Sequence, residues 1–275
     1  PTLPDEQKSA LVEEQFQKVL SENQAVADEQ VRQTAEYLKD FMRYEENGQK
    51  YTMMPDIDPY QYLRLARNYV DHGSLGDEIK NGVWCDTKII APFGRASYPH
   101  NNELHPYVLA HLHKIITFFK PTLPIMETAS YFPIIFVTLA VAFTFLFVHR
   151  INNKTGAIIS ATFIAIASSA VGRTQWGHAD TDAYNLFFPM ILCWIFAEAL
   201  ETEKTIKKYT LITLIGFIFG IYAFAWTGWW YLFDFILAGL IINTIYAFIF
   251  NRTKIVTSIV TTVIYFLSTA IFTGI

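Results

Sequence analysis

An arginine, a histidine and two aspartates stand together in the segment 173–185, RTQWGHADTDAYN, between two strongly apolar runs. A turn between apolar segments can be built from Gly, Asn and Ser, and charges beside a hydrocarbon region are costly unless they serve a purpose. Asp180 and Asp182 place two carboxylates one residue apart. Carboxylate oxygens are the ligands that Mg²⁺ or Mn²⁺ prefer, and a bound cation would offset their mutual repulsion. The spacing therefore points to a divalent metal site that needs further ligands.

A second acidic pair, Asp56 and Asp58, precedes a helix that we expect to begin near Tyr60. Pro59 is suited to the first turn of that helix. Asp58 would then lie at the helix N-terminus, where the helix dipole favours a carboxylate. Helix capping is therefore the structural alternative to a chemical role for this pair.

Taken together, the two acidic pairs favour a shared metal site. Hard oxygen ligands that converge from separate segments suit Mg²⁺ or Mn²⁺. Three carboxylates brought together would repel one another unless a cation held them. His178 is an additional candidate ligand, and a hydrogen-bonding role is its alternative.

The composition divides the chain into two regions. Of 275 residues, 52 % are hydrophobic and 16 % aromatic. Residues 1–125 are polar and mixed in charge, whereas residues 126–275 are nearly continuous hydrocarbon with short polar breaks. This pattern predicts an all-α polytopic membrane protein with a water-side segment in front, in contact with membrane lipids. The net charge of −4 argues against nucleic acid as a partner.

Cysteine and histidine spacing adds no further site. Cys85 and Cys193 provide neither a disulfide framework nor a zinc motif. His105, His111 and His113 have no recognised zinc spacing and stay unassigned.

The water-side segment, 1–125, should be helical at its start. Apolar residues at helical spacing between 5 and 47 predict a solvent-exposed helical hairpin. Proline and glycine then punctuate an irregular region with a short helix over 60–70.

The apolar region should form six transmembrane helices, because a span needs about 20 apolar residues. Trp226–Trp230 supplies the turn that divides the run 209–250, which is too long for one crossing. The expected spans lie near 126–148, 155–172, 183–200, 209–227, 229–250 and 254–275.

Basic residues predict the orientation. They fall in alternate breaks: His149, Arg150 and Lys154; Lys204, Lys207 and Lys208; Arg252 and Lys254. The positive-inside rule places these breaks in the cytoplasm. The breaks at 173–182 and 226–230 then face outward together with 1–125, so both acidic pairs lie on the external face of the cell membrane.

Ordered motifs across residues 56–230 carry a family resemblance. They are DPYQYLRLAR at 58–67 with DHGS at 71–74, WCD at 84–86 with PFGR at 92–95, Arg173 with WGHADTD at 176–182, and AWTG at 225–228. These resemble the first acidic motif, the segment after it, the second acidic motif and the Ala-Trp-Gly-Gly element of the catalytic subunit of oligosaccharyltransferase. The sequence looks closest to the single-subunit archaeal members.

The resemblance implies a GT-C-type multi-span glycosyltransferase membrane domain with a helical external loop. The family has thirteen spans and a C-terminal globular domain, so we expect this chain to be a fragment, with 1–125 as the first external loop and 126–275 as spans two to seven. It lacks the family's later catalytic glutamate, its Trp-Trp-Asp sequon-reading motif and its soluble domain. We therefore expect no acceptor sequon pocket here and no activity from this fragment alone. The stretch 5–47 is longer than a compact first loop needs.

The implied reaction is protein N-glycosylation. A glycan passes from a lipid-linked donor, a dolichyl or polyprenyl phosphate or pyrophosphate, to Asn in an acceptor polypeptide with an Asn-x-Ser/Thr sequon. By resemblance, Asp58 would bind Mg²⁺ or Mn²⁺ and contact the acceptor amide, and Asp180 and Asp182 would complete the catalytic carboxylates. Arg173 would support the donor phosphate or the acidic motif; a snorkelling interfacial arginine is the alternative.

Two other functions stay open at this point. A different membrane glycosyltransferase that uses a polyprenyl-phosphate sugar could share an external acidic motif but would need no sequon reader. A cation transporter could use external carboxylates. The spans contain few ionisable residues, among them Glu198 and Asp234, so they provide no evident charged path for a transporter.

Overall fold

The structure is a computed structural model that describes residues 5–96 and 104–274. The chain divides into two compact units, Pro1–Met53 and Met54–Ile275. The second unit contains both acidic pairs and all the apolar helices.

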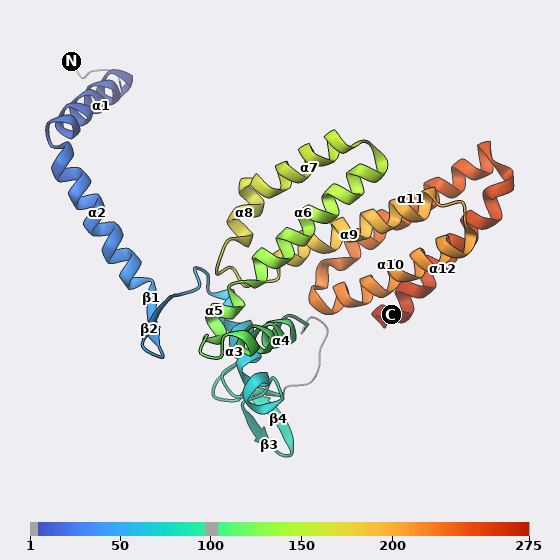
Figure 1. Cartoon of the computed structure of the whole chain (residues 1–275), viewed down its shortest axis with the longest axis horizontal. Helices are drawn as coiled ribbons and strands as arrows, with labels where there is room; N and C mark the ends of the chain where they lie inside the picture. Colours follow the sequence, from blue (N-terminus) through green and yellow to red (C-terminus); the bar gives the residue numbers. More distant parts are fainter. Residues whose placement is uncertain (1–4, 97–103, 275) are drawn as a thin grey trace. The chain divides into compact units, whose positions relative to one another are not determined.

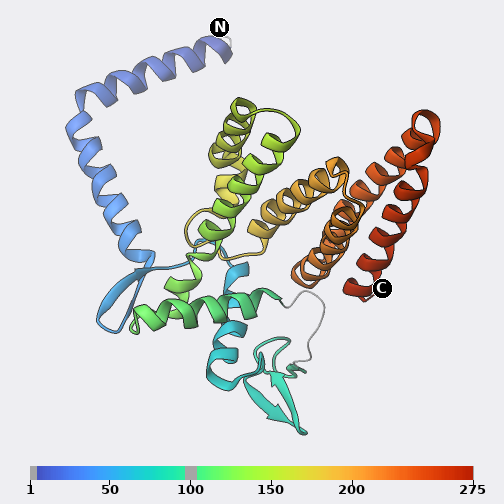
Figure 2. The same cartoon turned by 45° about the vertical axis from the view of Figure 1, so that its right-hand side comes forward.

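The first unit holds two helices and a β-hairpin. Its elements are α1 (Asp5–Glu22), α2 (Gln24–Phe41), β1 (Arg43–Glu46) and β2 (Gln49–Thr52) (Figure 1). The helices differ from the expected hairpin, because α1 and α2 diverge at Asn23 instead of lying side by side (Figures 1 and 2). No residue of α2 is buried. Apolar spacing predicts helices correctly, but it does not say whether the two apolar stripes meet.

The β-hairpin replaces the last residues of the expected helical stretch. Arg43 pairs with Thr52 in an antiparallel register. Asn47 and Gly48 both have positive φ, 54° and 72°, as a two-residue hairpin turn of type I′ requires. The Asn-Gly pair is itself a hairpin signal, which outweighs the weak helical spacing after Phe41.

The second unit begins with a small α/β layer. Its elements are α3 (Asp58–His72), β3 (Glu78–Lys80), β4 (Val83–Asp86), β5 (Arg95–Ala96) and α4 (Leu104–Phe119). The strands form one antiparallel sheet in the order β3-β4-β5. Arg64 on α3 donates to the buried Asp86 carboxylate, which ties this sheet to the helix. Helix α3 packs along α4.

The membrane region follows as a series of apolar helices. They are α5 (Ile125–Ala129), α6 (Phe132–Ile151), α7 (Lys154–Ile166), α8 (Ser168–Thr174), α9 (Asp182–Glu201), α10 (Thr205–Ala225), η1 (Thr227–Trp229), α11 (Trp230–Phe250), η2 (Arg252–Lys254) and α12 (Ile255–Thr273). Within the described ranges, five helical stretches are long and apolar enough to cross a membrane, and the pair α7–α8 makes a sixth if it counts as one span. The protein is therefore a multi-pass membrane protein.

The expected span over 155–172 is not one straight helix. Helices α7 and α8 meet at an angle of 52°. Ala167 has ψ 119°, outside the helical range, so the hydrogen-bond ladder stops there. Uniform hydropathy predicts the presence of a span but carries no signal for this break.

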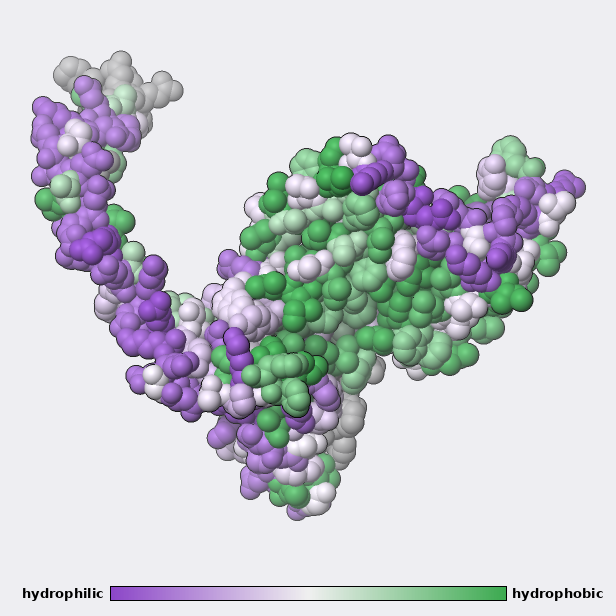
Figure 3. Space-filling model, in the orientation of Figure 1, coloured by the Kyte–Doolittle hydropathy of each residue, from purple (hydrophilic) through white to green (hydrophobic). Residues whose placement is uncertain are grey.

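The apolar helices pack in the neighbour order α7, α6, α9, α10, α12, α11 (Figure 2). Gly216 and Gly220 let α10 approach α12 closely, since a Cβ on Gly216 would lie 2.7 Å from the Ser268 carbonyl carbon. Figure 3 shows apolar residues over the outside of these helices and hydrophilic residues where their loops turn. Such a surface matches a lipid environment.

Helix α9 carries polar groups at its two ends, the acidic motif at its start and carboxylates paired with a basic residue near its end. It has 20 residues, so its ends lie about 30 Å apart. Asp182 is at its start, and Glu198 and Glu201 near its end pair with Arg150 of α6. The acidic loop and the basic loops thus lie at opposite ends of the bundle.

Candidate functional site

A polar cavity of about 420 Å³ lies where α3, the loop before α9 and the end of α10 meet. Its lining residues are Asp58, Gln61, Tyr62, Asp180, Thr181, Ala225, Trp226 and Thr227. The fold therefore brings Asp58 and Asp180 to one cavity from segments far apart in sequence. Trp226 forms part of the wall and stacks on Tyr222 one turn earlier, with ring centroids 6.0 Å apart.

Asp58 is the first residue of α3, and its carboxylate caps nothing. The N-cap residue is Ile57, without a side-chain capping bond. Among the residues that the structure describes, Asp58 forms no hydrogen bond or ion pair. Asp56, in contrast, accepts a hydrogen bond of 2.6 Å from the Ile57 N–H. Of this acidic pair, Asp58 is the one whose oxygens remain available to a ligand.

Asp180 is oriented by the residue that follows it. Its Oδ1 accepts hydrogen bonds from the Thr181 N–H and, at 3.3 Å, from the Thr181 hydroxyl. Its Oδ2 has no partner in the described part of the chain. One oxygen thus fixes the side chain while the other can bind a ligand in the cavity.

Asp182 and Arg173 form a separate pair. Arg173 Nη1 lies 3.6 Å from Asp182 Oδ2, and the arginine side chain is 69 % exposed. A pair this open to water contributes little to stability. Asp182 does not line the cavity. Asp182, the second aspartate of the motif, therefore lies outside the cavity that Asp180 lines and next to Arg173.

His178 bridges toward the first acidic pair. Its Nε2 lies 3.9 Å from Asp56 Oδ2. Its Nδ1 is buried and has no hydrogen-bond partner among the described residues. His178 is absent from the cavity lining, so its unpaired nitrogen is a candidate donor beside the cavity rather than in it.

The Tyr62 side chain lies close enough to both acidic motifs for their charges to affect its pKa. It lies one helical turn after Asp58 and lines the cavity. Burial raises the pKa of the Tyr62 phenol, and the negative charges of Asp180 and Asp58 raise it further. A cation in the cavity would be attracted by the same charges.

The donor set fits part of a metal shell. In the ranges 5–96 and 104–274, no group of three or more His, Cys, Asp or Glu side chains is arranged to hold one ion. Two carboxylates do line the same cavity. Mg²⁺-type ions commonly bind one or two carboxylates and complete the shell with water and substrate oxygens. Asp58 and Asp180 match that pattern.

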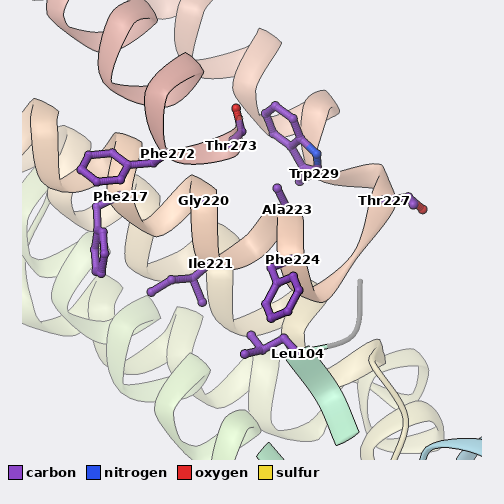
Figure 4. A pocket seen from close by; sticks show the side chains of 10 residues that line it. All are labelled: Leu104, Phe217, Gly220, Ile221, Ala223, Phe224, Thr227, Trp229, Phe272 and Thr273. Atoms are coloured by element: carbon purple, nitrogen blue, oxygen red, sulfur yellow. The ribbon is translucent and has the colours of Figure 1, made fainter. Parts of the chain in front are cut away.

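Two further cavities adjoin this site. An apolar cavity of about 440 Å³ shares Thr227 with it and lies between α10, α12 and Leu104 (Figure 4). A third, of about 630 Å³, shares Asp58 and carries Arg64, Arg67 and Lys88. Asp58 therefore lines both the polar cavity and this third cavity, which is mixed in character, and the polar cavity shares Thr227 with the apolar one.

Sequence reasoning missed several of these lining residues. Gln61 and Tyr62 follow Asp58 at helical spacing, so the face that they share with it was available as a signal. Trp226 belongs to the AWTG motif, which predicted a turn but no cavity wall. His105, which lines none of these three cavities but contacts the Ala179 carbonyl before Asp180, had no signal in its spacing.

Comparison with known proteins gives the family. The model of the N-terminal region of the oligosaccharyl transferase STT3 family matches residues 33–274. The dolichyl-phosphooligosaccharide-protein glycotransferase of Methanococcus voltae is 28 % identical over 210 residues, which cover 74 % of this chain and 22 % of that protein. The chain thus spans about a fifth of the length of this relative.

Solved structures agree on the fold. The Archaeoglobus fulgidus oligosaccharyltransferase AglB in complex with an inhibitory peptide and a dolichol-phosphate superposes with a TM-score of 0.61 at 18 % identity, covering 80 % of this chain and 25 % of that one. The complex of the oligosaccharyltransferase from the same organism with Zn and sulfate gives 0.58 at 20 % identity, covering 86 % and 29 %. With most of the chain inside the family model and its fold shared with these structures, the chain belongs to the STT3 oligosaccharyltransferase family.

Proposed function

We propose that the protein to which this chain belongs transfers an oligosaccharide from a lipid-linked donor to the asparagine of an Asn-x-Ser/Thr sequon. The chain supplies part of the catalytic membrane region. Its relative from Methanococcus voltae is a dolichyl-phosphooligosaccharide-protein glycotransferase, and the similar Archaeoglobus fulgidus protein is described in complex with dolichol-phosphate and an inhibitory peptide.

One observation carries this proposal. Asp58 and Asp180 line a polar cavity that shares Thr227 with an apolar cavity at the ends of α10 and α12. A donor with a hydrocarbon tail and a charged head needs such neighbouring environments. The carboxylates lie on the polar side, where the bond to the sugar would be exchanged.

The geometry supports the following assignment of the site residues. Asp58 and Asp180 would hold a divalent cation, Mg²⁺ or Mn²⁺, with water and donor oxygens as the other ligands. Asp182 and His178 flank this pair and would orient it or join the shell. The Archaeoglobus fulgidus oligosaccharyltransferase complex with Zn and sulfate supports the binding of a divalent cation and an oxyanion by this fold. Arg173 would hold Asp182 in place.

The difficulty of the reaction is that an amide nitrogen is a poor nucleophile. The Asp58 carboxylate would accept a hydrogen bond from the acceptor N–H, which would orient the nitrogen, and it would take up that proton as the new bond forms. As the N–C1 bond forms, the C1–O bond breaks, and its electron pair stays on the lipid phosphate. A divalent cation held by Asp58 and Asp180 would supply charge compensation for that leaving group. A rigid cavity matters because the gain comes from preset positions.

The site would face the outside of the cell membrane. The basic loops lie at the opposite end of the helices from Asp180 and Asp182, and basic loops prefer the cytoplasm. An external site would meet acceptor polypeptides after their export.

The test is transfer by the intact protein from a lipid-linked oligosaccharide to a peptide with an Asn-x-Thr sequon. We expect a glycopeptide with Mn²⁺ or Mg²⁺ present, and none with a Gln-x-Thr peptide of otherwise identical sequence. Glycan found on another acceptor, with the sequon peptide unmodified, would refute the proposal.

A further inference from the structure

His105, the second residue of α4, is completely buried and has partners at both ring nitrogens. Its Nε2 lies 2.8 Å from the Ala179 carbonyl oxygen, and its Nδ1 lies 3.3 Å from the Tyr184 hydroxyl. Ala179 immediately precedes Asp180, and Tyr184 follows Asp182 by two residues. The ring therefore contacts the chain on both sides of the second acidic motif.

The two partners define the protonation state of the ring. A carbonyl oxygen can only accept, so Nε2 carries the hydrogen. Nδ1 must then accept from the Tyr184 hydroxyl. Burial lowers the pKa of His105 to about 4, which keeps the ring neutral near pH 7. A neutral histidine with one donor and one acceptor satisfies both neighbours without a buried charge.

The His105 ring also contacts two further helices, α3, which carries Asp58, and α6 of the membrane region. Tyr62 packs edge-on against His105, with centroids 4.8 Å apart and an interplanar angle of 82°. Tyr62 belongs to α3, one turn after Asp58. The Phe132 ring also packs edge-on against the His105 ring, with centroids 4.6 Å apart. One side chain thus lies between the helix that carries Asp58 and the loop that carries Asp180.

The backbone of the loop 175–181 has few partners in other elements, although its side chains contact Tyr62, Tyr131 and Asp56. Its backbone hydrogen bonds are short-range: His178 to Gln175, Ala179 to Gly177, and Asp180 to His178. Within the described ranges, the His105 bond is the one hydrogen bond to the backbone of this loop from a helix not adjacent in sequence, and the Thr181 side chain hydrogen-bonds Tyr62 of α3. Removal of the His105 bond would free the Ala179 carbonyl, and with it the backbone just before Asp180, while the Tyr62–Thr181 contact and the rest of the fold persist.

We propose that His105 is a positioning residue that sets the separation of the Asp58 and Asp180 carboxylates by fixing the Ala179 carbonyl against α4. It touches neither substrate nor cation. The inference rests on the proposed function only in that the two carboxylates act as a pair. Because reacting groups must be placed within a fraction of an ångström, a displaced Asp180 would lower turnover steeply.

Three substitutions in the intact protein separate positioning from stability. In His105→Gln the amide nitrogen can reach the Nε2 position and donate to Ala179. In His105→Asn the shorter amide occupies the Nδ1 position, so it loses Ala179 and keeps a link to Tyr184. Tyr184→Phe removes the Tyr184 bond alone. His111→Gln on the same helix is the matched control, since His111 is exposed and bonds its own helix at Tyr107.

We expect His105→Asn to lower kcat/KM roughly 10-fold or more and to raise the Mn²⁺ concentration for half-maximal activity. His105→Gln and Tyr184→Phe should stay within about 3-fold of the unmodified protein in both quantities, since small shifts cost little when the Ala179 bond is kept. Melting temperatures should fall by similar amounts in the Asn and Gln variants. His111→Gln should change nothing.

Equal activity and equal Mn²⁺ response in the Asn and Gln variants would overturn the inference and leave His105 a purely structural residue. Mn²⁺ binding followed by electron paramagnetic resonance gives a readout that needs no turnover. If the unmodified protein binds Mn²⁺ but transfers no glycan, the proposed function fails while weaker binding in His105→Asn alone still supports positioning. If it neither binds nor transfers, both fail.

Discussion

Arg150 Nε lies 2.9 Å from Glu198 Oε1, joining α6 to α9 at the end of the bundle opposite Asp182. The nitrogen has no hydrogen bond of good geometry, so the contact is an ion pair rather than a directed hydrogen bond. Lys207 approaches the same glutamate at 3.8 Å, and Lys254 pairs with Glu203 at 3.2 Å. The basic residues of successive loops thus gather at one end, and this arrangement underlies the expected orientation.

The first prediction concerns two sequons in the chain itself, at Asn153 and Asn251. Asn153 accepts a hydrogen bond from the Gly156 N–H at the start of α7, and Asn251 accepts one from the Thr253 hydroxyl. Both lie at the basic end. We expect neither asparagine to carry a glycan, because the proposed site faces the other side of the membrane. Mass spectrometry of the native protein checks this. A glycan on either asparagine would mean that the orientation in the membrane is the reverse of the expected one.

The second prediction separates the members of the first acidic pair. Asp58→Asn and Asp180→Asn should each lower kcat/KM by roughly 100-fold or more, since both carboxylates line the cavity. Asp56→Asn should lower it much less, because Asp56 is engaged by Ile57 and faces His178. All three variants should reach the membrane in normal amounts. Similar losses for Asp56 and Asp58 would mean that the wrong aspartate has been assigned.

The third prediction is metal dependence. Treatment of the intact protein with EDTA should abolish transfer, and Mn²⁺ or Mg²⁺ should restore it, because two carboxylates alone repel one another and cannot compensate a leaving phosphate. Addition of EDTA already saturated with Mn²⁺ is the control for effects of the chelator itself. Full activity after removal of divalent ions would contradict the metal site.

The fourth prediction is a stability loss in acid caused by His105. Its pKa is about 4 in the folded protein, against an ordinary value of 6.5. Between these values the unfolded chain binds the proton and the folded chain does not, so the free energy of unfolding is full above about pH 6.5 and falls toward pH 4. The loss amounts to about 3 kcal/mol. Melting temperatures in detergent between pH 7 and 4.5 should show a weaker decline in His105→Gln than in the unmodified protein.

The fifth prediction tests the close approach of α10 and α12. A Cβ on Gly220 would lie 2.6 Å from the Phe272 carbonyl oxygen, which is backbone and cannot move aside cheaply. Gly220→Ala should destabilise the bundle by about 1–3 kcal/mol, seen as a lower melting temperature. Gly172→Ala is the control, because a Cβ there meets open space. Equal melting temperatures for both variants would show that the helices separate easily.

The sequence predicts those parts of the fold that hydropathy determines, and it predicts less well the parts that contacts between distant residues determine. The apolar runs and the acidic pairs are visible because each is a local pattern. The bend at Ala167 and the divergence of helices at Asn23 depend on tertiary packing, which has no periodic signature. The same reason hides His105, whose partners lie more than seventy residues away along the chain. Spacing also could not reveal that Asp182 turns from the cavity toward Arg173.

Helix α9 has a consequence for energetics across the membrane. Between Asp182 and Glu198 it carries no acidic or basic side chain, and Glu198 is already neutralised by Arg150 and Lys207. A charge that moves through the membrane field changes in energy by about 2.3 kcal/mol per 100 mV, but α9 offers no group that could relay one. Any movement of charge coupled to the proposed transfer would therefore have to follow another path than the length of α9 between Asp182 and Glu198.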